Sequence, residues 1–148
     1  MSARCCGLAL AAMLASAAAA DDGASAARGQ KLFQGELALP ARIAGQDFAL
    51  PAQASRCINC HAVSRSNAAS APADAQRIGP ALTAAALTDA VRRRGGPPSR
   101  YDAASLCKLL RSGVDPAYVM ILRTMPRYEV SEADCQSLWL HLATASTR

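Results

Sequence analysis

The apolar residues of this chain fall into short groups with the spacing of α-helices, separated by segments that have no regular period. The first group predicts a helix over residues 25–34, with Gly35 as its stop. The face of this helix that we expect to be buried carries Ala26, Gly29, Leu32 and Phe33.

Two further groups predict helices in the second half of the chain. Asp102 is a suitable N-cap for a helix over residues 102–112, because a short polar side chain can accept from free backbone N–H groups, and Gly113 ends it. Its apolar face holds Ala103, Leu106, Cys107 and Leu110. The last helix covers residues 131–144 and starts with a capping-box pattern. Its buried stripe consists of Cys135, Leu138, Trp139 and Leu142.

The remaining segments carry weaker patterns. Residues 83–93 predict a helix with an alanine-rich stripe, and part of residues 114–127 is expected to be helical from Pro116 onward. Residues 36–55 indicate an ordered but irregular arm. Residues 64–76 indicate an exposed loop that is rich in Ser, Ala, Asn and Pro.

The first 20 residues have the pattern of a secretory signal peptide. Arg4 supplies a positive charge, residues 8–14 form a short apolar run, and four alanines precede Asp21. An uncleaved membrane anchor is the alternative, but the apolar run is too short to span a bilayer comfortably. We therefore expect cleavage after Ala20, export to the periplasm, no membrane span in the mature protein, and one domain over residues 21–148.

The charge of the chain indicates little about its partners. Without Arg4, 15 Lys and Arg side chains face 11 Asp and Glu side chains. A surplus this small and dispersed is compatible with acidic protein partners but does not favour nucleic-acid binding. The arginines at residues 92–94 are expected to form a solvated helix end, with a docking patch as the alternative.

The strongest chemical signal is the pentapeptide Cys57-Ile58-Asn59-Cys60-His61. Two cysteines at this spacing, followed at once by histidine, are the pattern of covalent haem c attachment. On one helical turn both thiols can bond the same haem, and His61 then presents its Nε2 to the iron. A thioredoxin-like or disulfide pair would need a βαβ setting, and zinc would need a second ligand pair; the sequence indicates neither.

Several segments around this pentapeptide resemble the class I c-type cytochromes. They are the first helix with Gly29 and Phe33, the segment Gly79-Pro80-Ala81-Leu82, the segment Thr124-Met125-Pro126, and the Leu-rich last helix. The resemblance spans residues 26–144 and implies an all-α fold wrapped around one haem, with the first and last helices crossing beside it. Residues 36–55 and 64–76 depart from the family pattern, because these long irregular loops exceed what a minimal member needs. It also implies that the Pro80 carbonyl accepts from Nδ1 of His61 and that Met125 is the sixth iron ligand.

Two other side chains compete with Met125 for the sixth position. Met120 lies inside an apolar run, where a core role is the ordinary expectation. His141 lies on the last predicted helix, where the family often carries an aromatic packing residue. A His61 and Met125 pair would raise the reduction potential relative to two histidines and would leave no open iron position.

Cys107 and Cys135 both fall on apolar faces of predicted helices. The exported compartment permits disulfides, and a bridge would tie these two helices together and help to hold the Met125 loop between them. Two buried free thiols are the alternative. Because neither cysteine is followed by a histidine, we expect one haem per chain.

These features predict an electron carrier rather than an enzyme, because no acid, base or nucleophile accompanies the haem ligands. The expected partners are redox proteins, namely a periplasmic dehydrogenase and a terminal oxidase or reductase. One alternative is the electron-accepting cytochrome subunit of a periplasmic oxidoreductase complex, with residues 36–55 and 92–98 as docking elements. Another alternative is a gas-binding haem protein.

Overall fold

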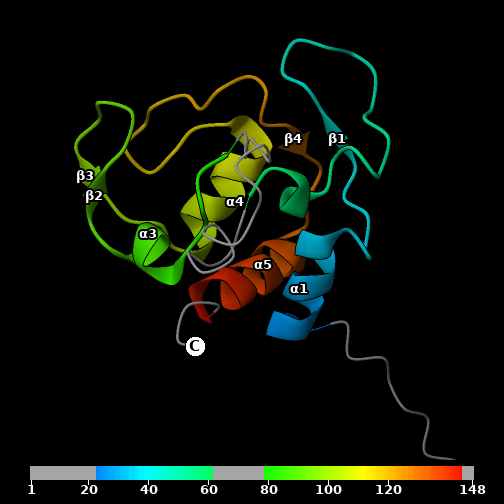
Figure 1. Ribbon diagram of the computed structural model, residues 1–148, viewed down its shortest axis with the longest axis horizontal. Coiled ribbons are helices and arrows are strands. Elements are labelled where there is room, and N and C mark those ends of the chain that lie inside the picture. Colours follow the sequence, from blue (N-terminus) through cyan, green and yellow to red (C-terminus); the bar gives the residue numbers. More distant parts are fainter. Residues whose placement is uncertain (1–22, 62–78, 145–148) are drawn as a thin grey trace, which may run out of the picture.

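The computed structural model describes residues 23–61 and 79–144 (Figure 1). The elements in chain order are α1 (Ala26–Gln34), β1 (Ala41–Arg42), the 3-10 helix η1 (Cys57–Asn59), α3 (Ala84–Thr88), β2 (Val91–Arg92), β3 (Pro98–Ser99), α4 (Ala103–Ser112), β4 (Arg127–Tyr128) and α5 (Glu132–Thr144). The expected signal peptide over residues 1–20 and the expected loop over residues 64–76 lie outside the described residues. Within the described ranges, no helix is both long and apolar enough to cross a membrane.

Three predicted helices, α1, α4 and α5, are confirmed nearly to the residue. Side chains and glycines at their ends determine where these helices begin and end. Ser25 and Asp102 accept hydrogen bonds from first-turn N–H groups of α1 and α4. Ser131 caps α5 in the same way. Gly35 and Gly113 end α1 and α4 with φ angles of 75° and 76°, which side chains other than hydrogen disfavour.

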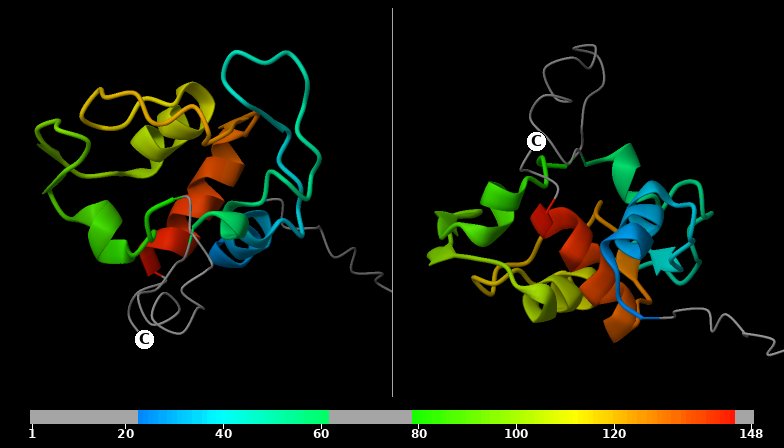
Figure 2. Two further views of the ribbon diagram at one scale, coloured as in Figure 1. Left: turned by 45° about the horizontal axis from the view of Figure 1, so that its top comes forward. Right: turned by 90° about the horizontal axis from the view of Figure 1, so that it is seen from below.

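Helices α1 and α5 cross and pack closely against each other (Figure 1, Figure 2). Gly29 lies at the crossing, where a Cβ atom would come 1.9 Å from the backbone oxygen of Ser137. Beside the crossing, Arg28 Nε lies 2.7 Å from Asp134 Oδ1 in an ion pair. The close approach of the two helices therefore depends on the glycine.

The buried core lies between α1, α4 and α5. Its larger apolar side chains include Leu32, Phe33, Leu106, Leu109, Leu110, Leu138 and Leu142. A disulfide between Cys107 and Cys135 joins α4 to α5, with Cα atoms 5.3 Å apart. The predicted bridge is thus confirmed. It closes a covalent loop of the chain, and Met125 lies within this loop.

The helix predicted over residues 83–93 is wrong beyond α3. The chain turns instead into an antiparallel hairpin, β2 and β3, in which Val91 lies opposite Ser99. The Arg93 side chain holds this hairpin, because it donates to the backbone carbonyls of Val91, Ser99 and Ala86. The expectation of a solvated helix end is therefore wrong for Arg93.

The helix predicted within residues 114–127 is also wrong, since the described structure has turns and extended backbone there. Asp115 explains the difference. Its buried Oδ1 accepts from Ala117 N and Val119 N, each at 2.9 Å, and such bonds compete with helical hydrogen bonding. Tyr118 moreover has a φ of 61°, outside the range of a right-handed helix.

Residues 36–55 form the irregular arm that the sequence predicts. Strand β1 in this arm pairs antiparallel with β4, placing Ala41 opposite Tyr128. The arm therefore contacts the segment just after Met125 (Figure 1). Among the described residues the named strands form two ladders, β1 with β4 and β2 with β3, beside a mainly helical core. A fold wrapped around a haem stays a prediction.

Candidate functional site

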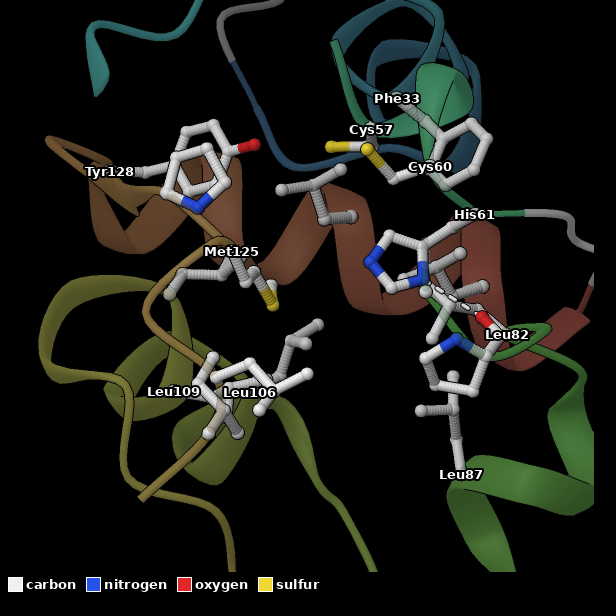
Figure 3. A pocket seen from close by; sticks show the side chains of 18 of the residues that line it. Phe33, Cys57, Cys60, His61, Leu82, Leu87, Leu106, Leu109, Met125 and Tyr128 are labelled. Carbon is white, nitrogen blue, oxygen red and sulfur yellow. Dashed lines mark hydrogen bonds between the residues drawn. The ribbon is translucent and has the colours of Figure 1, made fainter. Parts of the chain in front are cut away.

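One cavity brings together all five residues predicted to bind the cofactor. Its volume is about 700 Å³, and its lining includes Cys57, Cys60, His61, Pro80 and Met125. Figure 3 shows the two cysteine sulfur atoms beside one another and Met125 on a different wall from His61. Sites that enclose a large organic ligand have volumes of about 300–1,000 Å³, so the cavity is of suitable size.

Most of the remaining wall is apolar. It includes Phe33 of α1, Leu87 of α3, Leu106 and Leu109 of α4, and Leu138 of α5. Arg56, Arg93 and Arg94 also line the cavity, whereas no Asp or Glu of the described residues does. This lining suits a large apolar ligand that carries acidic groups.

The two cysteines of the pentapeptide lie on a 3-10 turn rather than on the α-helical turn that the sequence suggested. Cys57 belongs to η1 and Cys60 caps its end. The backbone N atoms of Cys60 and His61 both donate to Cys57 O, at 3.1 and 2.9 Å. This tight turn places both free thiols at the same cavity.

The surroundings of Cys57 do not fit the two other uses of a cysteine pair. Burial raises the pKa of the Cys57 thiol to about 11, and a hydrogen bond with Tyr128 acts in the opposite direction. Redox pairs of the thioredoxin type need a lowered thiol pKa. A zinc site is not supported either. The group of three potential metal ligands found in the described ranges consists of Cys107, Glu132 and Cys135, and its two cysteines are joined in a disulfide.

The His61 ring is held in one orientation. Its Nδ1 lies 2.8 Å from Pro80 O, the contact that the resemblance implies (Figure 3). Since a carbonyl can only accept, Nδ1 carries the proton and Nε2 keeps a free lone pair. At Gly79, a Cβ atom would come 2.3 Å from His61 Cε1, so this glycine makes room for the ring.

The protonation state of His61 also suits a metal ligand. Burial lowers the pKa of its imidazole, and the hydrogen bond to Pro80 acts in the opposite direction. The desolvated site therefore favours the neutral ring. A neutral imidazole is the form that binds a metal ion.

Met125 lies on the segment that leads into β4. Its backbone is held on both sides, because its N donates to Leu122 O at 3.2 Å and its O accepts from Arg127 Nη1 at 2.5 Å. The side chain is partly buried against the core. Figure 3 shows the thioether directed into the cavity.

The two competitors of Met125 are absent from the described lining of the cavity. Met120 is 60% exposed, so the core role expected for it is wrong. The His141 ring packs on Phe33 with ring centroids 5.7 Å apart, in agreement with the predicted packing role. The geometry therefore favours Met125 over both.

Tyr128 is a site residue that the sequence did not single out. It is buried, and its hydroxyl donates to Ser55 O at 2.8 Å. In Figure 3 the hydroxyl points toward the Cys57 sulfur. Tyr128 thereby links β4 to the turn that precedes η1. No pattern in the sequence around Tyr128 indicated this role.

Comparison of the chain with protein-family models, with curated proteins and with solved structures finds no match. The resemblance to class I c-type cytochromes is therefore carried by the segments of the sequence named above. The support for a function comes from those segments and from the geometry of the cavity.

Proposed function

We propose that this protein is an exported electron carrier that holds one covalently attached haem c, with His61 and Met125 as axial ligands. One observation carries the proposal: Cys57, Cys60, His61 and Met125 converge on one largely apolar cavity (Figure 3). When bound, the haem supplies a one-electron Fe(II)/Fe(III) couple. The chain supplies the attachment, the two ligands and the burial.

The donor atoms of the cavity fit this group. Cys57 and Cys60 would hold it through thioether bonds, since both thiols are free and line the same wall. His61 would bind the iron through Nε2, because its Nδ1 is engaged by Pro80. Met125 would bind through its thioether from the facing segment, and a His and Met pair raises the potential of a haem.

The charged side chains of the cavity fit the same group. Haem carries two carboxylates, and Arg56, Arg93 and Arg94 line a cavity that has no acidic side chain among the described residues. Arg93 donates to backbone carbonyls and Arg94 pairs with Asp115, so Arg56 is the arginine of the three whose side chain has no hydrogen-bond or ion-pair partner among the described residues. Arginine is well suited to hold carboxylates, because its planar fork donates two parallel hydrogen bonds. The apolar leucines of α3, α4 and α5 would exclude water from the rest of the group.

Expression of the full chain in a host that attaches haem in its periplasm tests the proposal. We expect the mass of the mature chain plus one haem, and a low-spin spectrum with the methionine-to-iron band in the oxidised state. The double variant Cys57→Ala/Cys60→Ala should lose covalent haem, whereas the matched variant Cys107→Ala/Cys135→Ala should keep it. A wild-type chain without covalent haem, or with a high-spin five-coordinate ferric spectrum, would refute the proposal.

The same protein separates an electron carrier from a gas-binding one. If Met125 closes the sixth position, CO binding to the reduced wild type should be slow and Met125→Ala should accelerate it. Rapid binding that Met125→Ala leaves unchanged would favour the gas-binding alternative.

A second candidate function, the cytochrome subunit of an oxidoreductase complex, is favoured by exposed apolar side chains between α4 and β4. Tyr118, Met120 and Leu122 are 80%, 60% and 67% exposed. Leu122 also lines the cavity, so this surface adjoins the site. Exposed apolar patches of this kind often mark protein contacts. Size-exclusion chromatography of the native periplasm would distinguish a subunit, which elutes in a complex, from a free carrier.

A further inference from the structure

Arg127 is a buried cation that has no carboxylate partner among the described residues. It is 9% exposed, and the ion pairs of the described part of the chain do not include it. Its Nη2 atom is buried and has no hydrogen-bond partner within those residues. Buried charges and buried donors are ordinarily paired, so this side chain requires an explanation.

One side of the guanidinium lies against the end of α4. A Cβ atom at Gly113 would come 2.3 Å from the Nε, Cζ and Nη2 atoms of Arg127. Gly113 is the C-cap of α4, and the last carbonyls of a helix carry a partial negative charge. This charge stabilises a nearby cation and explains how Arg127 is tolerated without a carboxylate.

The other side of the guanidinium holds the segment of Met125. Arg127 Nη1 donates to Met125 O at 2.5 Å, two residues back along the chain. The backbone of Arg127 is itself fixed in β4, where it lies opposite Arg42 of β1. The side chain thus connects the Met125 backbone to the C-terminal end of α4.

We propose that Arg127 is a positioning residue that clamps Met125 to α4 and that its unpaired charge raises the reduction potential of the site. This inference rests on the proposed function. A positive charge in a poorly screened environment favours the state of a redox centre that has gained an electron. The clamp keeps the thioether directed into the cavity when the charge of the site changes.

Arg123 provides a matched control, because it lies two residues before Met125 as Arg127 lies two residues after it. Arg123 is exposed, and its Nη2 donates to Ala44 O at 3.1 Å. Water and salt screen an exposed charge, so its removal should barely affect the potential. Arg127→Met removes both the charge and the hydrogen bond, whereas Arg127→Lys keeps the charge but loses the planar guanidinium that lies against Gly113 at the end of α4.

Two measurements on the holoprotein separate the charge from the clamp. Arg127→Met should shift the redox equilibrium about tenfold toward the oxidised form, equal to a potential about 59 mV lower for a one-electron couple. Arg127→Lys should keep most of the potential, and Arg123→Met should keep nearly all of it. Amide hydrogen exchange at Met125 and Ile121 should rise about tenfold in both Arg127 variants and stay unchanged in Arg123→Met.

Each half of the inference has its own refuting outcome. Equal potentials for Arg127→Met and Arg123→Met would overturn the role of the charge. Unchanged exchange at Met125 in Arg127→Lys would overturn the clamp. If Arg127→Met does not fold, Arg127→Gln replaces it in the potential measurement alone, since the amide removes the charge but can still donate to Met125 O. A wild-type chain that carries no haem would refute the proposed function but not the clamp. The clamp can still be tested in that folded chain, because amide hydrogen exchange at Met125 does not require haem.

Discussion

The wall of the cavity that carries His61 and the wall that carries Met125 are held by different kinds of contact. On the His61 wall, the backbone bonds of Cys60 and His61 both return to Cys57. The adjoining segment contributes two more contacts, Gly79 N to Cys60 O at 3.1 Å and the His61 ring to Pro80 O. These contacts all involve two short segments that both line the cavity.

The Met125 wall depends on residues that lie far away in the chain. Strand β4 is paired with β1 in the arm, and the Tyr128 hydroxyl reaches Ser55 across 73 positions of sequence. Ile121 N donates to Gly113 O at the end of α4. The disulfide joins the helices on either side of the wall.

The difference between the walls indicates how each can be disturbed. A local wall is affected by changes within its own segments. A wall that depends on long-range contacts is affected from several distant places. The Tyr128–Ser55 hydrogen bond joins the Met125 wall to the turn before η1, so substitutions elsewhere outside the cavity should loosen Met125 more than His61.

The largest loss of stability is expected from the double variant Cys107→Ala/Cys135→Ala. The bridged cysteines are 28 positions apart, so removing the bond should lower the unfolding free energy by about 3–4 kcal/mol. Urea denaturation followed by circular dichroism measures this loss, and reduction of the wild type should reproduce it. Amide exchange should rise more at Met125 than at His61. An equal rise at both amides would contradict the distinction between the walls.

Asp115→Ala should have an intermediate effect that is confined to the Met125 wall. The Asp115 side chain is fully buried, holds Ala117 N and Val119 N through Oδ1, and pairs with Arg94 at 3.3 Å through Oδ2. Loss of these bonds should lower the unfolding free energy by about 2 kcal/mol. Asp115→Asn keeps one acceptor oxygen and should cost less. Faster exchange at Gly79 in Asp115→Ala would show that the two walls are coupled.

Asp102→Ala should have the smallest effect, because it changes the start of α4, away from the end that Arg127 contacts. Loss of this N-cap should lower the unfolding free energy by about 1 kcal/mol at pH 7. Hydrogen bonds from Ser105 lower the pKa of Asp102 below its ordinary value of 3.8. The contribution of Asp102 to the unfolding free energy is therefore fully present above pH 3.8, and it is lost as the pH falls through the lowered pKa.

Denaturation across this pH range checks the sign of the Asp102 effect. The difference between wild type and Asp102→Ala should shrink toward zero in acid. Asp47→Ala, an exposed carboxylate outside the helices, is the control and should show little difference at any pH. A difference that grows in acid would contradict the capping role.

The predictable parts of this fold are those whose causes lie within a few residues. The limits of α1 and α4 follow from Ser25, Gly35, Asp102 and Gly113, because each cap bonds to its own first or last turn. The pentapeptide from Cys57 to His61 is recognisable for the same reason. The disulfide was also within reach, because both cysteines fall on apolar helix faces.

The parts that were predicted wrongly depend on contacts made only in the folded chain. Arg93 reaches three backbone carbonyls and thereby favours a hairpin over a longer helix. Asp115 is buried beside Arg94, and its bonds to nearby N–H groups replace the helix that Pro116 suggested. Nothing in the sequence near Arg93 separates it from an ordinary solvated arginine, whereas the pair Asp115-Pro116 is a local signal for a turn.

The two methionines of the last loop illustrate where sequence reasoning reaches its limit. The pentapeptide specifies two thiols and an imidazole as a unit, since their spacing alone brings them to one side of a turn. Met120 and Met125 are five residues apart, and only their flanking residues favoured Met125. Packing of the loop on α4, β1 and the arm turns Met125 into the cavity and leaves Met120 60% exposed. That outcome depends on long-range contacts such as those of Arg127 and Tyr128, which exist only after the chain has folded.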